Sequence, residues 1–192
     1  MSESRKYLCL NIQSLISGNY SIVPIRNQDR HLIRKWRNSQ IEILRQKAPI
    51  SVEEQDNYFE KVVSSLFFLK NPNQLLFSFF EGSCLIGYGG LVHIDWESRN
   101  GEISFLIETE RNANIRQFKD DWSVFLDLMN KIAFEHLNFH KIYTYAYDIR
   151  PHYFEVLKVK GFCEEARLKS HIFINDKLYD VRILSLFNVN EN

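Results

Sequence analysis

The chain of 192 residues is poor in cysteine and has no long apolar run. Its three cysteines, at positions 9, 84 and 163, form no C-x-x-C pair, which argues against a disulfide framework or a zinc site. No apolar stretch reaches the length of a membrane span, and the N-terminal segment lacks the features of a signal peptide. The sequence therefore predicts a soluble, cytoplasmic protein without a metal.

The chain also has no excess of charge of either sign. Its 24 lysines and arginines balance 24 aspartates and glutamates, so there is no general attraction to a polyanion. This balance argues against nucleic acid or an anionic membrane as partner. An anionic small molecule would need a local basic patch.

Nothing in the sequence divides the chain into several domains. It has no internal repeat, low-complexity tract or linker rich in proline and glycine. A hydrophobic content of 45% at this length is enough to bury a core without cross-links. We predict a polar lead-in over residues 1–18, one domain over residues 19–187 and a short tail over residues 188–192.

The first half of the domain predicts a strand, two helices and an antiparallel hairpin. Asn27 or Asp29 is suited to cap the first helix, and Ser51 to Glu54 has the spacing of a capping box for the second. In chain order, these elements cover residues 20–25, a helix carrying Leu32, Ile33 and Trp36, a helix from about Val52 to Ser65, and strands 75–80 and 84–95 joined at Gly82-Ser83.

The second half predicts a crossover of strand, helix and strand over residues 101–108, 121–137 and 141–148. Such a unit is normally right-handed with parallel strands, and its ligand lies where the strand ends meet the helix N-terminus. A short helix opened by Pro151 follows, then strands 166–174 and 178–186. The order predicts an α+β (mixed α/β) fold with one central sheet.

Four segments together carry a family resemblance. They are Lys35-Trp36-Arg37-Asn38, Ile86-Gly87-Tyr88-Gly89-Gly90, Ala133-Phe134-Glu135-His136-Leu137 before Lys141-Ile142, and Leu157-Lys158-Val159-Lys160-Gly161-Phe162. With these segments the chain resembles the GNAT superfamily of acetyl-CoA-dependent N-acetyltransferases, closest to its ribosomal-protein alanine and aminosugar branch. The resemblance implies a mixed sheet of about seven strands flanked by about four helices, with acetyl-CoA as co-substrate and no metal.

The family's phosphate-binding loop departs from its usual pattern in this chain. The loop usually has the pattern Gln/Arg-x-x-Gly-x-Gly/Ala, and counting back from Ala133 places Gln117 to Trp122 there, with Asp120 and Trp122 at the glycine positions. Two outcomes stay open: the coenzyme is held by basic side chains, or it has been lost. The residues implied in coenzyme binding are Gln117 with Arg111, Arg116 and Lys119 for the phosphates, and the backbone of Phe105, Leu106 and Ile107 for the pantetheine arm.

Amine acetylation needs a group that takes a proton from the acceptor, because an alkylamine has a pKa of about 10. By resemblance, Glu102 at the start of its strand is the first candidate base, and the alternative is a surface glutamate. His93 is the second candidate, and its alternative is a half-buried histidine bonded to backbone. Tyr153 or His152 is the candidate general acid, unless both only pack or face solvent.

The acceptor region is expected around Arg37, Arg45 and Gln46, where a basic, hydrogen-bonding loop suits a phosphate-bearing amine. We predict a nucleotide-linked amino-deoxysugar. Protein N-termini, an antibiotic, or a non-catalytic binding module are alternatives, and a homodimer is left open.

Two further patterns have competing interpretations. Tyr143, Tyr145 and Tyr147 share one strand face, which favours packing in the core or at an interface over stacking on bases. Gly87, Gly89 and Gly90 crowd one strand and indicate a bulge or a close approach of a ligand.

Overall fold

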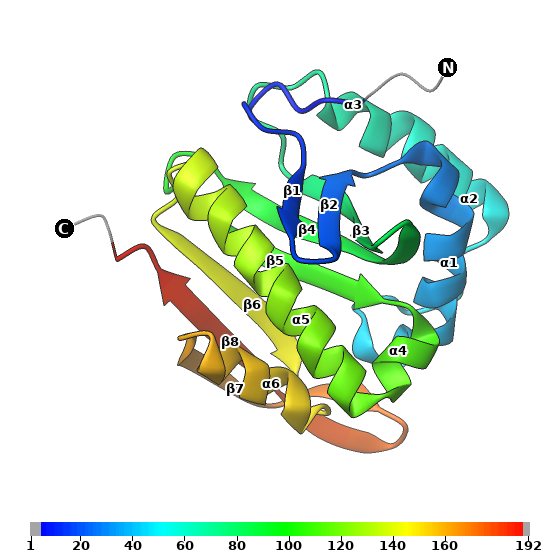
Figure 1. Ribbon diagram of the computed structural model, residues 1–192. Coiled ribbons are helices and arrows are strands. Elements are labelled where there is room, and N and C mark those ends of the chain that lie inside the picture. The colour runs from blue at the N-terminus through cyan, green and yellow to red at the C-terminus, as the bar shows by residue number, and fades with distance from the viewer. Residues whose placement is uncertain (1–4, 190–192) are drawn as a thin grey trace.

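The computed structural model describes residues 5–189, which form one mixed sheet with helices on its two faces (Figure 1). The eight strands lie in the order β1-β2-β3-β4-β5-β6-β8-β7. They are β1 Leu15–Ser17, β2 Tyr20–Pro24, β3 Leu75–Glu81, β4 Cys84–Asp95, β5 Asn100–Ile107, β6 Lys141–Tyr147, β7 Cys163–Ile174 and β8 Lys177–Phe187. The predicted strands are all present, and β1 is an additional one.

Two long helical runs each include a π-helical segment. Helix α2 continues into α3 through η3, and α5 continues into η4. Figure 1 shows α5 crossing one face of the sheet beside α6, with α1 and α2 away from them. The segments are η1 Asn27–Asp29, α1 Arg30–Ser39, η2 Ile41–Ile43, α2 Val52–Asn57, η3 Tyr58–Val63, α3 Ser64–Leu66, α4 Thr109–Ala113, α5 Ile115–Asn130, η4 Lys131–His136 and α6 Pro151–Val159.

Local sequence signals explain several element ends, and one predicted cap is wrong. The capping box at Ser51 is formed in full, and Pro151 occupies the first turn of α6. Neither Asn27 nor Asp29 caps α1 with its side chain. The Asp29 carboxylate instead accepts hydrogen bonds from Arg26 and from Ser78 on β3, so it ties the start of α1 to the sheet.

Part of the predicted polar lead-in packs into the core. Tyr7 is 1% exposed, and its hydroxyl donates to the carbonyl of Leu76 at 2.8 Å and accepts from the Leu76 amide at 2.9 Å. Strand β1 then pairs with β2, so this segment extends the sheet at its edge. Its pattern was missed because a three-residue strand carries too little alternation to be recognised.

The core between α5 and the sheet is rich in aromatic rings. Trp122 stacks on Phe105 of β5, with ring centroids 4.7 Å apart, and Phe79 of β3 meets Phe125 edge to face. Trp122 and Phe125 are fully buried with Met129. These contacts fix α5 against β5, a strand that lines the site.

Strands β5 and β6 are parallel, as predicted, but they pair along only a short stretch. The register joins Asn100 to Lys141, Gly101 to Ile142 and Glu102 to Tyr143, and no pairing follows among the described residues. Because β5 stays paired with β4 to Ile107 and β6 stays paired with β8 to Tyr147, the two strands separate beyond Glu102. This opening positions the candidate site.

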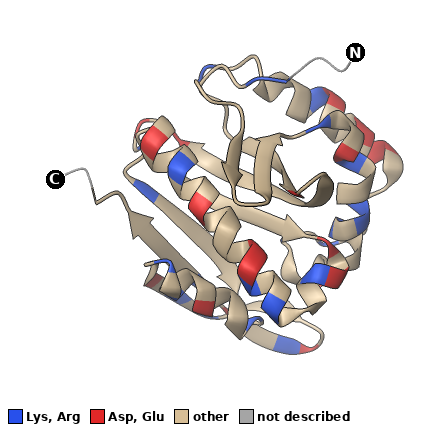
Figure 2. Ribbon diagram, in the orientation of Figure 1, with Lys and Arg blue, Asp and Glu red and all other residues tan. Residues whose placement is uncertain are grey.

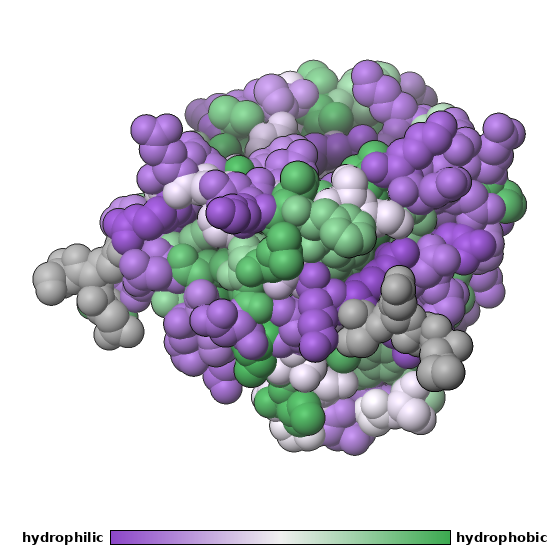
Figure 3. Space-filling model, turned by 90° about the horizontal axis from the view of Figure 1, so that it is seen from above, coloured by the Kyte–Doolittle hydropathy of each residue, from purple (hydrophilic) through white to green (hydrophobic). Residues whose placement is uncertain are grey.

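The surface is mixed in character. Figure 2 shows basic and acidic residues interspersed, as on the outer face of α5. Figure 3 shows polar residues over most of one face, with apolar residues in separate patches. In residues 5–189, no helix is both long and apolar enough to cross a membrane.

Candidate active site

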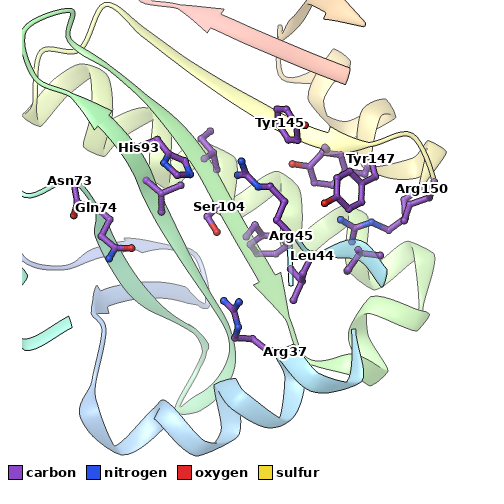
Figure 4. Close-up of a pocket in the computed structure, with 17 residues that line it drawn as sticks. Arg37, Leu44, Arg45, Asn73, Gln74, His93, Ser104, Tyr145, Tyr147 and Arg150 are labelled. Carbon is purple, nitrogen blue, oxygen red and sulfur yellow. The ribbon is translucent and has the colours of Figure 1, made fainter. Parts of the chain in front are cut away.

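A cavity of about 550 Å³ lies where β5 and β6 separate (Figure 4). Its floor comes from β4, β5 and β6, and its rim from α1, the segment after η2 and the start of α6. Figure 4 shows Arg37, Arg45 and Arg150 entering it from different elements, with His93 and Gln74 near one end and Tyr147 near the other. Its size suits a small-molecule site.

Glu102 lies at the point where the two strands part. It is the last residue of β5 that pairs with β6, and it is 4% exposed. Its carboxylate forms an ion pair with Arg45, and His93 Nε2 lies 3.9 Å from its Oε2 atom. The structure therefore brings together Glu102, Arg45 and His93, which the sequence had singled out separately.

The surroundings of Glu102 act on its pKa in opposite directions. Burial raises the pKa, because an ionised carboxylate loses hydration, while the charges of Arg45 and His93 lower it. Burial prevails, so the pKa lies above the ordinary value for a glutamate. A raised pKa moves a carboxylate towards the range in which it accepts a proton effectively near neutral pH.

His93 owes its position to an irregularity in β4. The register between β4 and β5 shifts between Val92 and Asp95, and His93 has a φ of 49°. This bulge leaves the imidazole 64% exposed at one end of the cavity. The exposed imidazole does not fit the alternative interpretation of His93 as a half-buried histidine bonded to backbone.

The two candidate acids have different surroundings. Tyr153 lines the cavity, is 6% exposed and stacks on Trp122, and burial raises the pKa of its phenol. His152 does not line the cavity and packs edge to face on Phe118. Burial and the charge of Arg150 lower the pKa of His152. Only Tyr153 therefore remains placed for contact with a ligand.

A second cavity, of about 330 Å³, opens between α1, α2 and the sheet. It shares Arg37, Gln74, Val92 and Ser104 with the first, so the two cavities are neighbours. The Arg37 guanidinium stands at their junction and donates to the Tyr88 hydroxyl at 2.8 Å.

Gln46 acts on this junction indirectly. It accepts a hydrogen bond from Arg37 Nε at 3.0 Å and donates to Asn38, and it lines neither cavity. Gln46 is therefore a positioning residue for Arg37.

Sequence reasoning missed two tyrosines of the site. Tyr145 and Tyr147 line the cavity, and the Arg45 guanidinium lies 4.8 Å from the Tyr145 ring centroid. The interpretation of these rings as packing residues is wrong, because β6 loses its neighbour β5 beyond Tyr143. The alternation of aromatic residues was visible, but the loss of the neighbouring strand was not.

The predicted start of the long helix is also wrong. Helix α5 begins at Ile115, and the Asn114 side chain caps it by accepting from the Gln117 amide. Residues Gln117 to Trp122 are therefore helical, and the short helix α4 occupies the connection after β5. The Asn-x-x-Gln spacing is the signal that indicates this start.

The four predicted phosphate ligands do not gather around one site. Arg111 forms ion pairs with Asp121 at 2.7 Å and Glu81 at 3.0 Å, so two carboxylates already hold its charge. Gln117 donates to the same Asp121. The remaining two are on the outer part of α5, where Arg116 is exposed and Lys119 pairs with Glu155 at 2.5 Å.

The backbone of β5 fits an extended, amide-bearing ligand better than the helix start fits phosphates. Phe105 lines the cavity, and beyond Glu102 the β5 edge facing β6 has no strand partner in the described structure. Leu106 and Ile107 continue this edge, although the Ile107 carbonyl accepts a hydrogen bond from Gln40. The exposed edge is compatible with a pantetheine arm.

The clustered glycines of β4 serve backbone packing. A Cβ atom on Gly90 would lie 1.8 Å from the Leu75 carbonyl oxygen, and one on Gly89 would lie 2.2 Å from that of Ser104. A bulge, as predicted, falls beside Gly87, where the pairing with Phe79 and Phe80 shifts by one residue. The close neighbours of these glycines are adjacent strands.

Comparisons with known proteins agree with this geometry. Residues 22–183 match the acetyltransferase (GNAT) domain family. A spermidine N-acetyltransferase from Vibrio cholerae in complex with CoA and spermine is similar in structure, with a TM-score of 0.78, 20% identity, and coverage of 90% of this chain and 97% of that one. A dodecameric structure of spermidine N-acetyltransferase from the same organism has a TM-score of 0.75 and 21% identity, with coverage of 90% of this chain and 95% of that one.

At these identities the structural likeness shows the fold, and a search of curated proteins finds no match. The family match extends over most of the chain and carries the assignment. The chain therefore belongs to the GNAT acetyltransferase family, and the prediction of an acetyl-CoA-dependent N-acetyltransferase is confirmed at the level of that family.

Proposed function

We propose that this chain moves an acetyl group from acetyl-CoA to the primary amine of a small acceptor, with Glu102 as general base. The observation that carries the proposal is the position of Glu102, buried at the point where β5 and β6 separate. Its partners Arg45 and His93 line the larger cavity, and the two neighbouring cavities offer separate spaces for an acyl donor and an acceptor.

The reaction forms a bond between the amine nitrogen and the acetyl carbon, and it breaks the carbon–sulfur bond of the thioester. Glu102 takes the proton that the acceptor ammonium must lose before its nitrogen can attack. The electron pair of the broken bond leaves with the sulfur, and the second proton that the nitrogen loses on becoming an amide goes to this thiolate or to solvent. A thiolate whose conjugate acid has a pKa of about 8.5 leaves readily, so a strong acid is not required.

Tyr153 is the group best placed to assist the leaving thiolate. Burial raises the pKa of Tyr153, so its phenol stays protonated at neutral pH and acts as a hydrogen-bond donor. The tyrosine lines the cavity from α6, whereas Glu102 stands on β5. This arrangement supports a base and a donor that come from different elements.

For the acceptor we infer an amine that also carries negative charge, such as a nucleotide-linked amino-deoxysugar. Three arginines line the main cavity, whereas Glu102 lies outside its lining and is paired with Arg45, and Glu54 lines the neighbouring cavity. Arg37 lines both cavities and forms no ion pair within residues 5–189. A polycation would meet repulsion here, although the structural relatives are spermidine acetyltransferases.

Acetyl-CoA binding, followed by an acceptor panel, tests this proposal. Calorimetry with acetyl-CoA is expected to give saturable binding. Thiol release is then compared for a nucleotide-linked aminosugar, spermidine, a peptide N-terminus and an aminoglycoside. We expect kcat/KM to be highest for the aminosugar, by about tenfold or more, the value of one charge-assisted hydrogen bond.

Each other result has a definite meaning. A preference for spermidine would replace the anionic acceptor by a polyamine, and a preference for the peptide or the aminoglycoside would select that class. Coenzyme binding without thiol release for any amine would favour a non-catalytic module. The homodimer stays a separate prediction, which sedimentation can check.

Replacing Arg45 by methionine is expected to shift the pH profile of kcat/KM. Arg45 lowers the pKa of Glu102, so its removal raises that pKa, and the acidic limb of the profile moves to higher pH. His93, the other group that lowers it, remains in place. Lys47→Met, at an exposed position two residues away, is the control and should leave the limb unmoved. A shift to lower pH, or no shift, would contradict the assignment of this limb to Glu102.

A further inference from the structure

Arg150 is a cationic side chain of the cavity with neutral partners only. It donates to the Asn112 side chain at 3.1 Å, and its guanidinium lies 5.3 Å from the Phe118 ring centroid and 5.0 Å from that of Tyr153. No carboxylate contacts it within residues 5–189. It thus differs from Arg45 and Arg111, which both have acidic partners.

Such a site is costly for the protein without a ligand. Burial lowers the pKa of Arg150 to about 10, because the guanidinium loses part of its hydration in the cavity wall. The side chain still carries its charge at neutral pH. A partly buried charge without a counter-charge is unfavourable for the fold, so its presence in a cavity wall calls for an anion from outside the chain.

The place of Arg150 in the fold indicates where this anion lies. The residue precedes α6, and Figure 4 shows its side chain directed into the end of the cavity near Tyr147. Its Asn112 partner belongs to α4, the short helix that occupies the connection after β5. An anion here would sit at the end of the open β5 edge, beyond any group bound along Phe105.

We propose that Arg150 binds a phosphoryl group of a ligand in this cavity and replaces the missing glycine loop as the anion anchor. The inference rests on the proposed function and assigns the role to one residue. The planar guanidinium, already oriented by two rings and one amide, can donate two parallel hydrogen bonds to a phosphoryl group. The phosphoryl group belongs either to the coenzyme or to a nucleotide-linked acceptor.

Calorimetry on wild type and on Arg150→Met tests the anchor with three probes: CoA, pantetheine and a nucleoside diphosphate. If the coenzyme supplies the phosphoryl group, the Kd for CoA rises roughly 10- to 100-fold and that for pantetheine stays within about twofold. If the acceptor supplies the phosphoryl group, the Kd for the nucleoside diphosphate rises by a similar factor and the Kd for CoA does not change. Lys131→Met, at an exposed lysine that opens η4, is the control for loss of one positive charge and should leave all three unchanged.

A melting temperature of each ligand-free variant distinguishes binding from a structural role. Arg150→Met removes an uncompensated charge, so its Tm is expected to equal or exceed that of the wild type. Equal affinities of wild type and variant for both phosphorylated probes would overturn the anchor, and a lower Tm in that case would assign Arg150 to packing. If the wild type binds neither CoA nor the nucleoside diphosphate, both the anchor role of Arg150 and the proposed function are wrong. If wild type and variant bind them equally well, only the anchor role is wrong.

Discussion

Replacing Glu102 by glutamine is expected to lower kcat at neutral pH by about 10²- to 10⁴-fold, the usual contribution of a general base. Glutamine keeps the shape of the side chain but cannot take the proton of the acceptor ammonium. The Kd for acetyl-CoA should change little, because Arg45, freed from its partner, is 46% exposed and stays solvated. Steady-state rates and calorimetry measure the two quantities.

The pH dependence of this defect separates base catalysis from a general disturbance. As pH approaches the amine pKa of about 10, more acceptor is already neutral and less depends on the base. The ratio of wild-type to variant rates should therefore shrink with rising pH. A constant ratio would remove Glu102 from proton transfer.

Two variants complete this test. Glu97→Gln, at an exposed turn position, is the matched control and should keep wild-type kcat. His93→Gln should lower kcat less than Glu102→Gln, because the exposed imidazole lies outside the point where the strands separate. The reverse order would make His93 the base.

The sequence predicted the elements whose signals are local. The Ser51 capping box and the Asn175-Asp176 turn, at which both residues have positive φ, mark their element ends by short-range chemistry. The start of α5 was placed six residues too late, near Asp121 instead of Ile115. The predicted start came from the apolar periodicity of residues 121–137, which weakens in the mostly polar residues 116–120.

The position of a candidate site residue was predictable where it follows from the residue's own strand and not where it depends on distant elements. Glu102 and His93 lie close together because the antiparallel register brings Val92 opposite Glu102, while their catalytic roles stay predictions. Arg150 was missed, because a single arginine in a loop has no periodicity. Arg111 was assigned to phosphates, because the sequence cannot show that Glu81 and Asp121 converge on it.

Asp121 forms the most densely bonded carboxylate in the described structure. It is fully buried and accepts hydrogen bonds from Arg111 Nε at 2.8 Å, Arg111 Nη2 at 2.7 Å, Gln117 at 2.9 Å and the Tyr20 hydroxyl at 3.0 Å. Burial and this carboxylate raise the pKa of Tyr20 to about 12, so the phenol remains a donor. The cluster joins the consecutive helices α4 and α5 to β2, which is distant from them in sequence.

Asp121→Asn is therefore expected to lower the free energy of unfolding by about 3 kcal/mol, since removing one partner of a buried ion pair leaves the other charge uncompensated. Glu81 keeps part of the Arg111 charge paired, which places the loss at the low end of the usual range. Urea denaturation measures this loss, and Asp120→Asn at the exposed neighbouring position is expected to stay within about 0.5 kcal/mol of wild type.

Arg111→Met should lower the free energy of unfolding by a similar amount without selectively weakening CoA binding, because this arginine serves the fold. A selective loss of CoA affinity in Arg111→Met would return Arg111 to the phosphate site and leave Asp121 as the group that an incoming phosphate displaces.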